Sequence, residues 1–560
     1  MGFRWAHRAV LAVAMSAGLL SPVVAQGLAG PYLAAREANL LDDFDHAAEY
    51  YTRAVQADPT NAPLIQSALV SHVLAGNTRT AIALARRLES VESGNLFAAL
   101  VLTAEAVRAG DYGTALLTMP QNPEVLTPLL QDVVGGWLAV GAGDKTAARN
   151  SFSRLADDPN FGAVVRYNQA MAFAFQGELE AAAELMDGDA EGPLHVNRNS
   201  ILAHAEILGV LGRTDEALAV VETYIANGIT DPAFFNMQSA LLGREVTKFT
   251  YVSDVAQPIA ETLVIVAEAL GRDQPNRMGL LFARLAGYLL PGYEEAILSS
   301  ADLLSGIGQH QLAAESFNDI PENSTNYISA QTGRAEALRA GGDVDAATEV
   351  LETLAAQYPD DADVMNALGD IYRMQDMFEE SRAAYDAVIA GFEAGATPNW
   401  LVYYTRGITS ERLGEWDLAE PDFRKALELS PDQPWVLNYL GYSLVEKGEK
   451  LEEAQAMIER AVEQMPTNGY IVDSLAWVLY RLGKYEEAVG PMERAAELMP
   501  VDPIINDHLG DVLWMVGRKR EAAFHWSRAL SLEPEEDEIA RIRRKLEVGL
   551  DVVLEEEAAE

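Results

Sequence analysis

The residue types that most often carry out chemistry are few in this sequence and widely separated. There is no cysteine, and none of the eight histidines is spaced from another histidine or a carboxylate as metal ligands are. The HExxH motif, the phosphate-binding loop, the dinucleotide fingerprint and the GxSxG elbow are also absent. We therefore expect no metal, no cofactor and no catalytic residue, and catalysis is unsupported rather than excluded. The histidines are His7, His46, His72, His195, His204, His310, His508 and His525.

A row of aromatic and polar residues near the C-terminus is better suited to binding. Large flat rings bury much area, and amide or guanidinium groups pair with backbone polar groups, so such a row suits an extended peptide or a partner helix. Trp435, Asn438 and Tyr442 are the strongest candidates for a groove, whereas Trp477 and Trp514 could equally belong to the core between repeats. The row comprises Trp435, Asn438, Tyr442, Tyr470, Asp473, Trp477, Tyr480, Arg481, Asp507, Asp511 and Trp514.

Three copies of one unit, within residues 434–534, must position this row. Gly441, Ala476 and Gly510 occupy the same small-residue position, 35 and then 34 residues apart. Two helices approach closely only where one of them carries Gly or Ala. A turn glycine should end the first helix in a left-handed residue, and a proline should end the second. The glycines that should end the first helices are Gly448, Gly483 and Gly517, and the prolines that should end the second helices are Pro466, Pro500 and Pro534.

This unit resembles the tetratricopeptide repeat (TPR), a helix-turn-helix unit of about 34 residues. The same small-residue marker can be followed back through most of the chain, with weaker identity toward the N-terminus. The resemblance implies an all-α fold, a TPR helix-turn-helix superhelical solenoid of about fourteen units. The earlier markers are Ala35, Leu69, Thr103, Gly136, Ala170, Ala205, Ala267, Ala301, Ala335, Gly369 and Gly407.

The repeat spacing is interrupted twice. Between Ala205 and Ala267 no marker fits, and Pro258 prevents one continuous helix through the gap. We interpret 231–266 as an irregular joint between two solenoid halves; a degenerate repeat that packs normally is the alternative. A 38-residue step after Gly369 predicts a longer loop over 390–400.

The two ends of the chain differ from the repeats. Arg4 and Arg8 precede an apolar run over 9–20 and small residues up to Ala25, which is the pattern of a secretory signal peptide cleaved after Ala25. The alternative is an uncleaved anchor in the inner membrane. We therefore expect a periplasmic protein. The predicted divisions are a signal peptide (1–25), an N-terminal solenoid half (26–230), the joint (231–266), a C-terminal half (267–534), and a capping helix with an acidic tail (535–560).

The charge of the chain limits its partners. The formal net charge is −43 at pH 7. Such a surface repels phosphate backbones, so we expect no nucleic-acid partner, while protein partners with basic patches would be attracted. The alternative is that the acidity serves solubility alone. Membrane contact is left open.

Residues 402–534 resemble a large TPR family of the proteobacterial cell envelope. The similarity rests on VYYTRGITSERLGEWDLAEPDFRKALELSPDQPWVLNYLGYS, YIVDSLAWVLYRLGKYEEAV and INDHLGDVLWMVGRKREA. Some relatives are outer-membrane lipoproteins, and envelope TPR proteins of this kind can act as adaptors that deliver substrates to a carboxyl-terminal processing protease. This chain departs from them because it has no cysteine for lipidation.

These observations favour a non-catalytic periplasmic scaffold or adaptor that binds other envelope proteins. The resemblance implies a periplasmic protease and its substrates as partners. One alternative is a scaffold for envelope polysaccharide or outer-membrane assembly. Another is an enzyme or small-ligand binder with a site at the central joint, near Tyr251 and Asp254.

Overall fold

The structure is a computed structural model that describes residues 27–119, 128–188, 192–227, 231–272 and 276–559. The predicted signal peptide lies outside the described residues. The chain divides into two compact units, residues 1–343 and 344–560, and each is considered by itself. The expected joint at 231–266 lies inside unit 1, and the domain limits taken from the sequence stay predictions.

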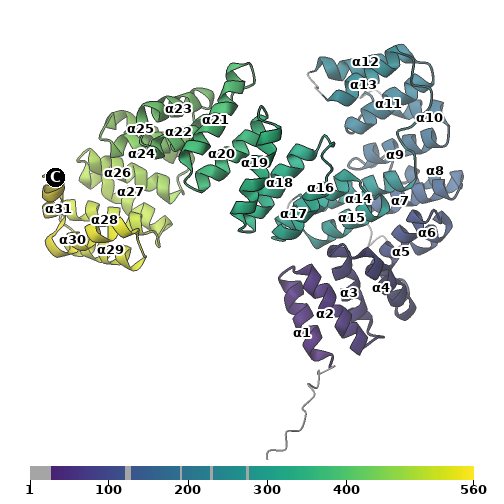
Figure 1. Cartoon of the computed structure of the whole chain (residues 1–560), viewed down its shortest axis with the longest axis horizontal. Coiled ribbons are helices and arrows are strands. Elements are labelled where there is room, and N and C mark those ends of the chain that lie inside the picture. The colour runs from purple at the N-terminus through teal and green to yellow at the C-terminus, as the bar shows by residue number, and fades with distance from the viewer. Residues whose placement is uncertain (1–26, 120–127, 189–191, 228–230, 273–275, 560) are drawn as a thin grey trace, which may run out of the picture. The chain divides into compact units, whose positions relative to one another are not determined.

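The described residues of unit 1 form eight antiparallel helical hairpins, with α13 (Pro232–Leu242) after the sixth and α18 (Tyr327–Ala340) after the last (Figure 1). The hairpins are α1 (Ala29–Leu40) with α2 (Phe44–Ala57), α3 (Ala62–Leu74) with α4 (Thr78–Val91), α5 (Leu96–Arg108) with α6 (Tyr112–Thr118), α7 (Pro128–Gly141) with α8 (Lys145–Ser153), α9 (Gly162–Phe175) with α10 (Leu179–Asp187), α11 (Arg198–Val210) with α12 (Thr214–Ala226), α14 (Ala256–Gly271) with α15 (Arg277–Leu289), and α16 (Glu294–Gly306) with α17 (His310–Asn318).

Over its described residues, 344–559, unit 2 begins with α19 (Val344–Gln357), continues with five hairpins and ends with two further helices, α30 (Glu536–Val548) and α31 (Leu550–Glu557). The hairpins are α20 (Ala362–Met374) with α21 (Phe378–Glu393), α22 (Trp400–Arg412) with α23 (Trp416–Leu429), α24 (Pro434–Glu446) with α25 (Leu451–Gln464), α26 (Gly469–Arg481) with α27 (Tyr485–Leu498), and α28 (Pro503–Met515) with α29 (Lys519–Ser531).

Small residues sit where the two helices of a hairpin cross, as the sequence predicts. Each marker lies within a helix, and no helix carries two of them. At Gly407 of α22 a Cβ atom would lie 2.7 Å from the ring of Phe423 on α23, and at Gly369 of α20 it would lie 2.7 Å from the ring of Tyr385 on α21. A ring of the second helix therefore fills the space that a side chain at the glycine would need, and this fit fixes the register of the hairpin.

The turns between paired helices also follow the prediction. Gly448, Gly483 and Gly517 have φ of 66°, 74° and 82°, the left-handed region that glycine adopts at low cost. Asp42 and Asp376 adopt the same conformation, with φ of 56° and 57°, without being glycine. Aspartate tolerates this region better than most residues, so the turns at Asp42 and Asp376 keep the same geometry as the glycine turns.

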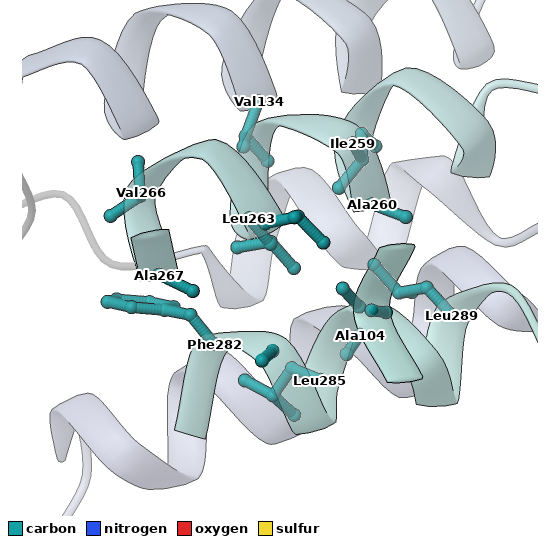
Figure 2. Packing of buried hydrophobic residues seen from close by; sticks show 14 of the residues in the cluster. Ala104, Val134, Ile259, Ala260, Leu263, Val266, Ala267, Phe282, Leu285 and Leu289 are labelled. Carbon is teal, nitrogen blue, oxygen red and sulfur yellow. The ribbon is translucent and has the colours of Figure 1, made fainter. Parts of the chain in front are cut away.

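One hairpin of unit 1 folds back onto earlier repeats. Helix α14 packs against α7, and α15 packs against α3 and α5 (Figure 1). Figure 2 shows Val134 of α7 and Ala104 of α5 lying with the apolar side chains of α14 and α15, and the small void between them has a volume of about 40 Å³. The faces of α3, α5 and α7 that an isolated solenoid would present are therefore covered by the chain itself.

Polar contacts fix the ends of this back-folded hairpin. Arg277, at the start of α15, donates from Nε to Asp42 at 2.5 Å and also bonds Asn39, both near the end of α1. Arg108, at the end of α5, donates to the carbonyl of Tyr288 at 3.0 Å and lies over the Tyr288 ring at 4.6 Å. These contacts join residues that are far apart in sequence, and the repeat spacing does not predict them.

The non-helical segment 243–255 leads into the back-folded hairpin. The buried carboxylate of Glu206 accepts hydrogen bonds from the backbone amides of Thr250 and Tyr251, at 3.1 and 3.0 Å. Asp254 accepts from the amide of Ala256 at 2.8 Å and so caps α14. Backbone groups that lack a helical partner are thus satisfied by carboxylates. Tyr251 and Asp254, near which a small-ligand site was an alternative, have these structural contacts.

Two sequence expectations are wrong in detail. Helix α21 continues to Glu393, so Gly391 is helical and the extra residues of the 38-residue step extend a helix before the loop begins. The C-terminus holds two helices rather than one capping helix, because Gly549 at φ 90° interrupts the chain between α30 and α31. Acidic residues near the C-terminus form ion pairs with α30: Glu556 lies 2.6 Å from Arg544, and Glu557 lies 2.7 Å from Arg541.

Over the described ranges, none of the helices combines the length and the apolar character that crossing a bilayer demands.

Candidate functional site

The first helices of successive hairpins in unit 2 line a pocket of about 520 Å³. Its wall is formed by α22, α24, α26 and α28, together with the residues at their ends. Four residues of the predicted row meet there: Asn438, Tyr442, Tyr470 and Asp473. The helices contribute different parts, with α22 supplying its end, α24 its middle and end, α26 its first half and α28 its start. The pocket therefore runs obliquely across the repeats, as an extended chain could.

Asn438 is the most informative residue of this pocket. It is half-buried on α24, and its Oδ1 atom is shielded from solvent yet accepts no hydrogen bond from any described residue. A buried acceptor without a donor costs about 1–3 kcal/mol. Such groups are rare in folded proteins and call for an explanation, which a donor on a bound molecule would provide.

A second pocket, of about 360 Å³, shares Tyr442, Glu446 and Ile504 with the first. Trp477 and Arg481 of the predicted row line it. We call the two adjoining pockets the groove. The second pocket extends the groove from α24 past α28 to α30, so the C-terminal helix forms one of its ends.

Carboxylates dominate the charge of the first pocket. Glu411, Glu446, Asp473 and Asp502 line the first pocket, and Glu446 lines both. Glu446 accepts a hydrogen bond from Trp477 Nε1 at 2.6 Å, which holds its carboxylate in place. The basic side chains of this pocket lie over aromatic rings and not against the carboxylates. Lys447 Nζ, for example, lies 5.0 Å from the centroid of the Trp416 ring. The first pocket of the groove is therefore suited to a cationic group.

Two tyrosines of the groove stay neutral over a wide pH range. Burial raises the pKa of Tyr442, and Glu446 and Asp473 raise it further. Burial also raises the pKa of Tyr439, whose hydroxyl donates to Glu411 at 3.2 Å. Both hydroxyls are therefore hydrogen-bonding groups rather than charges at neutral pH.

Asp473 belongs to a buried contact with the next repeat. It accepts from His508 Nδ1 at 3.0 Å, and the His508 ring stacks on Trp477 with centroids 3.9 Å apart. Burial alone would lower the pKa of His508, but Asp473, with Asp507 and Asp511 nearby, raises it above the usual value. The contact fixes both Asp473 and Trp477 at the wall of the groove.

The other members of the predicted row lie elsewhere. Trp435 is 45% exposed on the first turn of α24 and lines neither pocket. Tyr480 is buried and stacks on Trp477, with centroids 4.7 Å apart. Trp514 packs against Trp526, 5.3 Å between centroids, and under Lys519. Of the two tryptophans for which core packing was the alternative, Trp477 combines burial with a place in the groove, and Trp514 is partly buried and packs against the core.

Two aspartates of the row bind the end of the chain. Lys545 of α30, with no exposed side-chain surface, contacts Asp507 at 2.6 Å and Asp511 at 2.7 Å. Arg541 lies 3.6 Å from both. Helix α30 therefore occupies the place where a further repeat would begin.

Several groove residues were missed in the sequence. Glu446 and Lys447 lie at the end of α24, and Asp502 and Ile504 lie at the start of α28, whereas the predicted row used mainly the middle of each helix. The spacing of 34 residues between Tyr470 and Ile504 could have found the latter. Arg541 and Glu538 carry no such signal, because the repeats end at Pro534.

These features define an all-α solenoid of tetratricopeptide helix-turn-helix repeats. Residues 32–61, 332–399, 400–433 and 440–503 match tetratricopeptide repeat families. The chain is 28% identical over 159 residues to the TPR repeat-containing protein PA4667 of Pseudomonas aeruginosa. The aligned part is 28% of this chain, and it spans about a quarter (26%) of the length of that relative.

Solved structures with similar folds share little sequence with this chain. The APC/C hetero-tetramer Cut9-Hcn1 is 13% identical, with 88% of this chain and 96% of that chain covered and a TM-score of 0.39. A tetratricopeptide repeat protein from Parabacteroides merdae is 16% identical, with 44% and 96% covered and a TM-score of 0.37.

Proposed function

We propose that this protein is a non-catalytic scaffold that binds an extended segment of another protein in the groove of unit 2. The observation that carries the proposal is the unpaired Oδ1 of Asn438, placed in a pocket that crosses four helices. A backbone N–H of a bound peptide supplies the missing donor, and an extended peptide presents such donors at regular intervals.

The walls of the groove also indicate the side chains of that peptide. A lysine or arginine would meet Glu446, Asp473 and Asp502, while Tyr442 and Ile504 would cover its aliphatic stem. The formal net charge of −43 would bring such a basic segment toward the protein before contact. We therefore propose a basic, extended segment as the ligand.

The cellular setting is part of the proposal. The pattern of residues 1–25 supports export to the periplasm, and the resemblance of residues 402–534 to envelope TPR proteins supports presentation of substrates to a carboxyl-terminal processing protease. The N-terminal peptide of the protein isolated from cells should begin at Gln26. Recovery of a peptide that retains Met1 would contradict export with cleavage.

Selection from a random peptide library tests the groove. We expect bound peptides to be enriched in Lys and Arg, and Asn438→Ala to weaken their binding about tenfold, or about 1.4 kcal/mol. Asn366→Ala is the matched control, because Asn366 has the same register in α20 but already donates to Asp370 at 3.1 Å. Circular dichroism should be unchanged in both variants.

Two results would contradict the proposed groove. One is a set of selected peptides that bind the wild type and Asn438→Ala equally well. The other is loss of helicity in Asn438→Ala, which would mean that Asn438 supports the fold rather than a ligand.

A further inference from the structure

Unit 1 contains a pocket of about 390 Å³ at the seam where the back-folded hairpin meets the N-terminal repeats. Its wall combines the turn between α3 and α4, the end of α5, the middle of α15, the start of α16 and the end of α17. Pockets of this size at a seam between structural elements are common places for small ligands. The residues that decide its chemistry are Thr78, Arg108, Arg284, Tyr288, Ser316 and Asp319.

Arg284 is the unexplained residue of this pocket. Its Nε atom is shielded from solvent and has no hydrogen-bond partner, and its guanidinium forms no ion pair of 4.0 Å or less with a described residue. Burial lowers the pKa of Arg284, although Asp319 and Asp45 oppose the shift from a greater distance. In a chain with a net charge of −43, carboxylates are plentiful, yet neither Asp319 nor Asp45 forms an ion pair with Arg284 within 4.0 Å.

A guanidinium that is partly withdrawn from water and lacks an ion pair is costly, and folded proteins normally pair such groups. A guanidinium has five N–H donors arranged to receive a planar or tetrahedral anion. The pocket in front of Arg284 is open, so the missing acceptor can be a molecule that enters from solution. This cost to the free protein is recovered when that molecule binds.

The rest of the wall fits the same ligand. Arg108 is held by its bond to the Tyr288 carbonyl and its position over the Tyr288 ring, which leaves other N–H groups of its guanidinium for a second contact. The hydroxyls of Thr78, Ser300 and Ser316 donate to backbone carbonyls, so the two guanidinium groups are the donors to an anion. Leu285 and Ile297 contribute apolar surface. Two cations at one end and apolar side chains beside them suit an anionic head on a short apolar body.

We propose that this pocket binds a small organic anion, with Arg284 as the principal contact and Arg108 as the second. A carboxylate and a phosphate monoester share the required chemistry. Asp319, which is exposed on the rim, repels such a ligand and sets an upper limit on its affinity. This site is independent of the peptide groove of unit 2.

Titration calorimetry of the full-length chain with hexanoate and with phenyl phosphate tests the proposal. At least one of the two should bind at a single site below about 10 mM, whereas hexanol and phenol, which lack the charge, should not. The acid that binds identifies the source of the anionic group. Arg284→Met should weaken binding more than tenfold, and Asp319→Asn should strengthen it. Arg79→Met, an exposed arginine beside the pocket, is the matched control and should leave binding unchanged.

The unfolding temperature of the free protein gives a second readout. Arg284→Met should leave it unchanged or raise it, because the substitution removes a partly buried cation that has no ion pair, and the ligand should no longer raise it. The proposal is overturned if neither acid binds, if the alcohols bind equally well, or if Asp319→Asn weakens binding. A lower unfolding temperature for free Arg284→Met would also overturn it, since Arg284 would then serve the fold.

Discussion

Asp473 and His508 form a pair at the wall of the groove, where two repeats meet. His508 is buried and its ring is stacked on Trp477, so its charge is balanced mainly by Asp473 and not by water. The pair couples the geometry of the groove to the protonation of one imidazole.

The titration of His508 is the first prediction. In the wild type its pKa, measured by NMR, should lie above about 6.5, and in Asp473→Asn it should fall below that value because burial then dominates. Since the folded-state pKa is the higher one, the protonated pair stabilises unit 2 fully below about pH 6.5, and this contribution is lost as the pH rises through the folded-state pKa. A wild-type pKa below 6.5 would contradict the assignment.

The second prediction concerns Lys545, which holds α30 onto the last repeat. Lys545→Met should reduce the free energy of unfolding of unit 2 by about 3–5 kcal/mol, because Asp507 and Asp511 would stay buried without their principal cation. Urea denaturation measures the change. Lys519→Met, which removes an exposed pair with Asp551, should cost less than about 1 kcal/mol. Equal effects of the two substitutions would show that burial does not decide the value of these pairs.

At the scale of residues, the sequence locates part of the groove and misplaces the rest for one reason. Asn438, Tyr442, Asp473, Trp477 and Arg481 were chosen by their register within a repeat, and that register is real. A helix turns by about 100° per residue, so a position displaced by one or two residues moves from the groove to the core. Tyr480 and Trp514 show this displacement, and only the packing of neighbouring helices reveals it.

The crossing glycines decide how closely the helices of a hairpin approach. A Cβ at Gly407 would lie 2.7 Å from the Phe423 ring, whereas a Cβ at Gly391, also helical, would meet no atom within 4 Å. The same substitution should therefore have opposite effects at the two positions.

This contrast is the third prediction. Gly407→Ala should lower the free energy of unfolding of unit 2, because overpacking costs about 1–3 kcal/mol and exceeds the roughly 1 kcal/mol that alanine gains in a helix. Gly391→Ala should raise the free energy of unfolding by about 0.5–1 kcal/mol. Urea denaturation of the two variants beside the wild type measures both. Stabilisation by Gly407→Ala would mean that Phe423 moves aside at little cost.

At the scale of elements, the hairpins are predictable and their exceptions are not. A marker recurs in every described hairpin and a turn glycine in most of them, with a closing proline in the last three units, so the hairpins can be predicted from the sequence. The back-folding of α14 and α15 depends on contacts such as Arg277 with Asp42 and Arg108 with Tyr288, which have no recurring spacing. The break at Gly549 was missed because the apolar positions on its two sides continue one helical pattern.

The two units differ in their contacts between helices that are far apart in sequence. In unit 2, each hairpin packs mainly on its neighbours, as in an open array of repeats. In unit 1, α14 and α15 also contact α3, α5 and α7. Stability should therefore be shared across unit 1 and remain more local within unit 2.

Hydrogen exchange after a matched substitution is the fourth prediction. Leu285→Ala, at a buried position of α15, should destabilise unit 1 by about 2–5 kcal/mol and speed exchange in α3 and α5 as well as in α15. Leu444→Ala, at a buried position of α24, should speed exchange in α24 and the adjacent hairpins. Unchanged exchange in α3 and α5 after Leu285→Ala would contradict this shared stability.

The back-folded hairpin also restricts how the gene can change. Duplication or deletion of one repeat between α7 and α13 would shift α14 and α15 along the chain and separate them from the three helices that receive them. The described helices of unit 2 have no comparable packing between distant repeats, so an added repeat there only lengthens the array. Related genes should therefore differ in repeat number within the second unit while the count in the first stays constant, and a comparison of their lengths would reveal it.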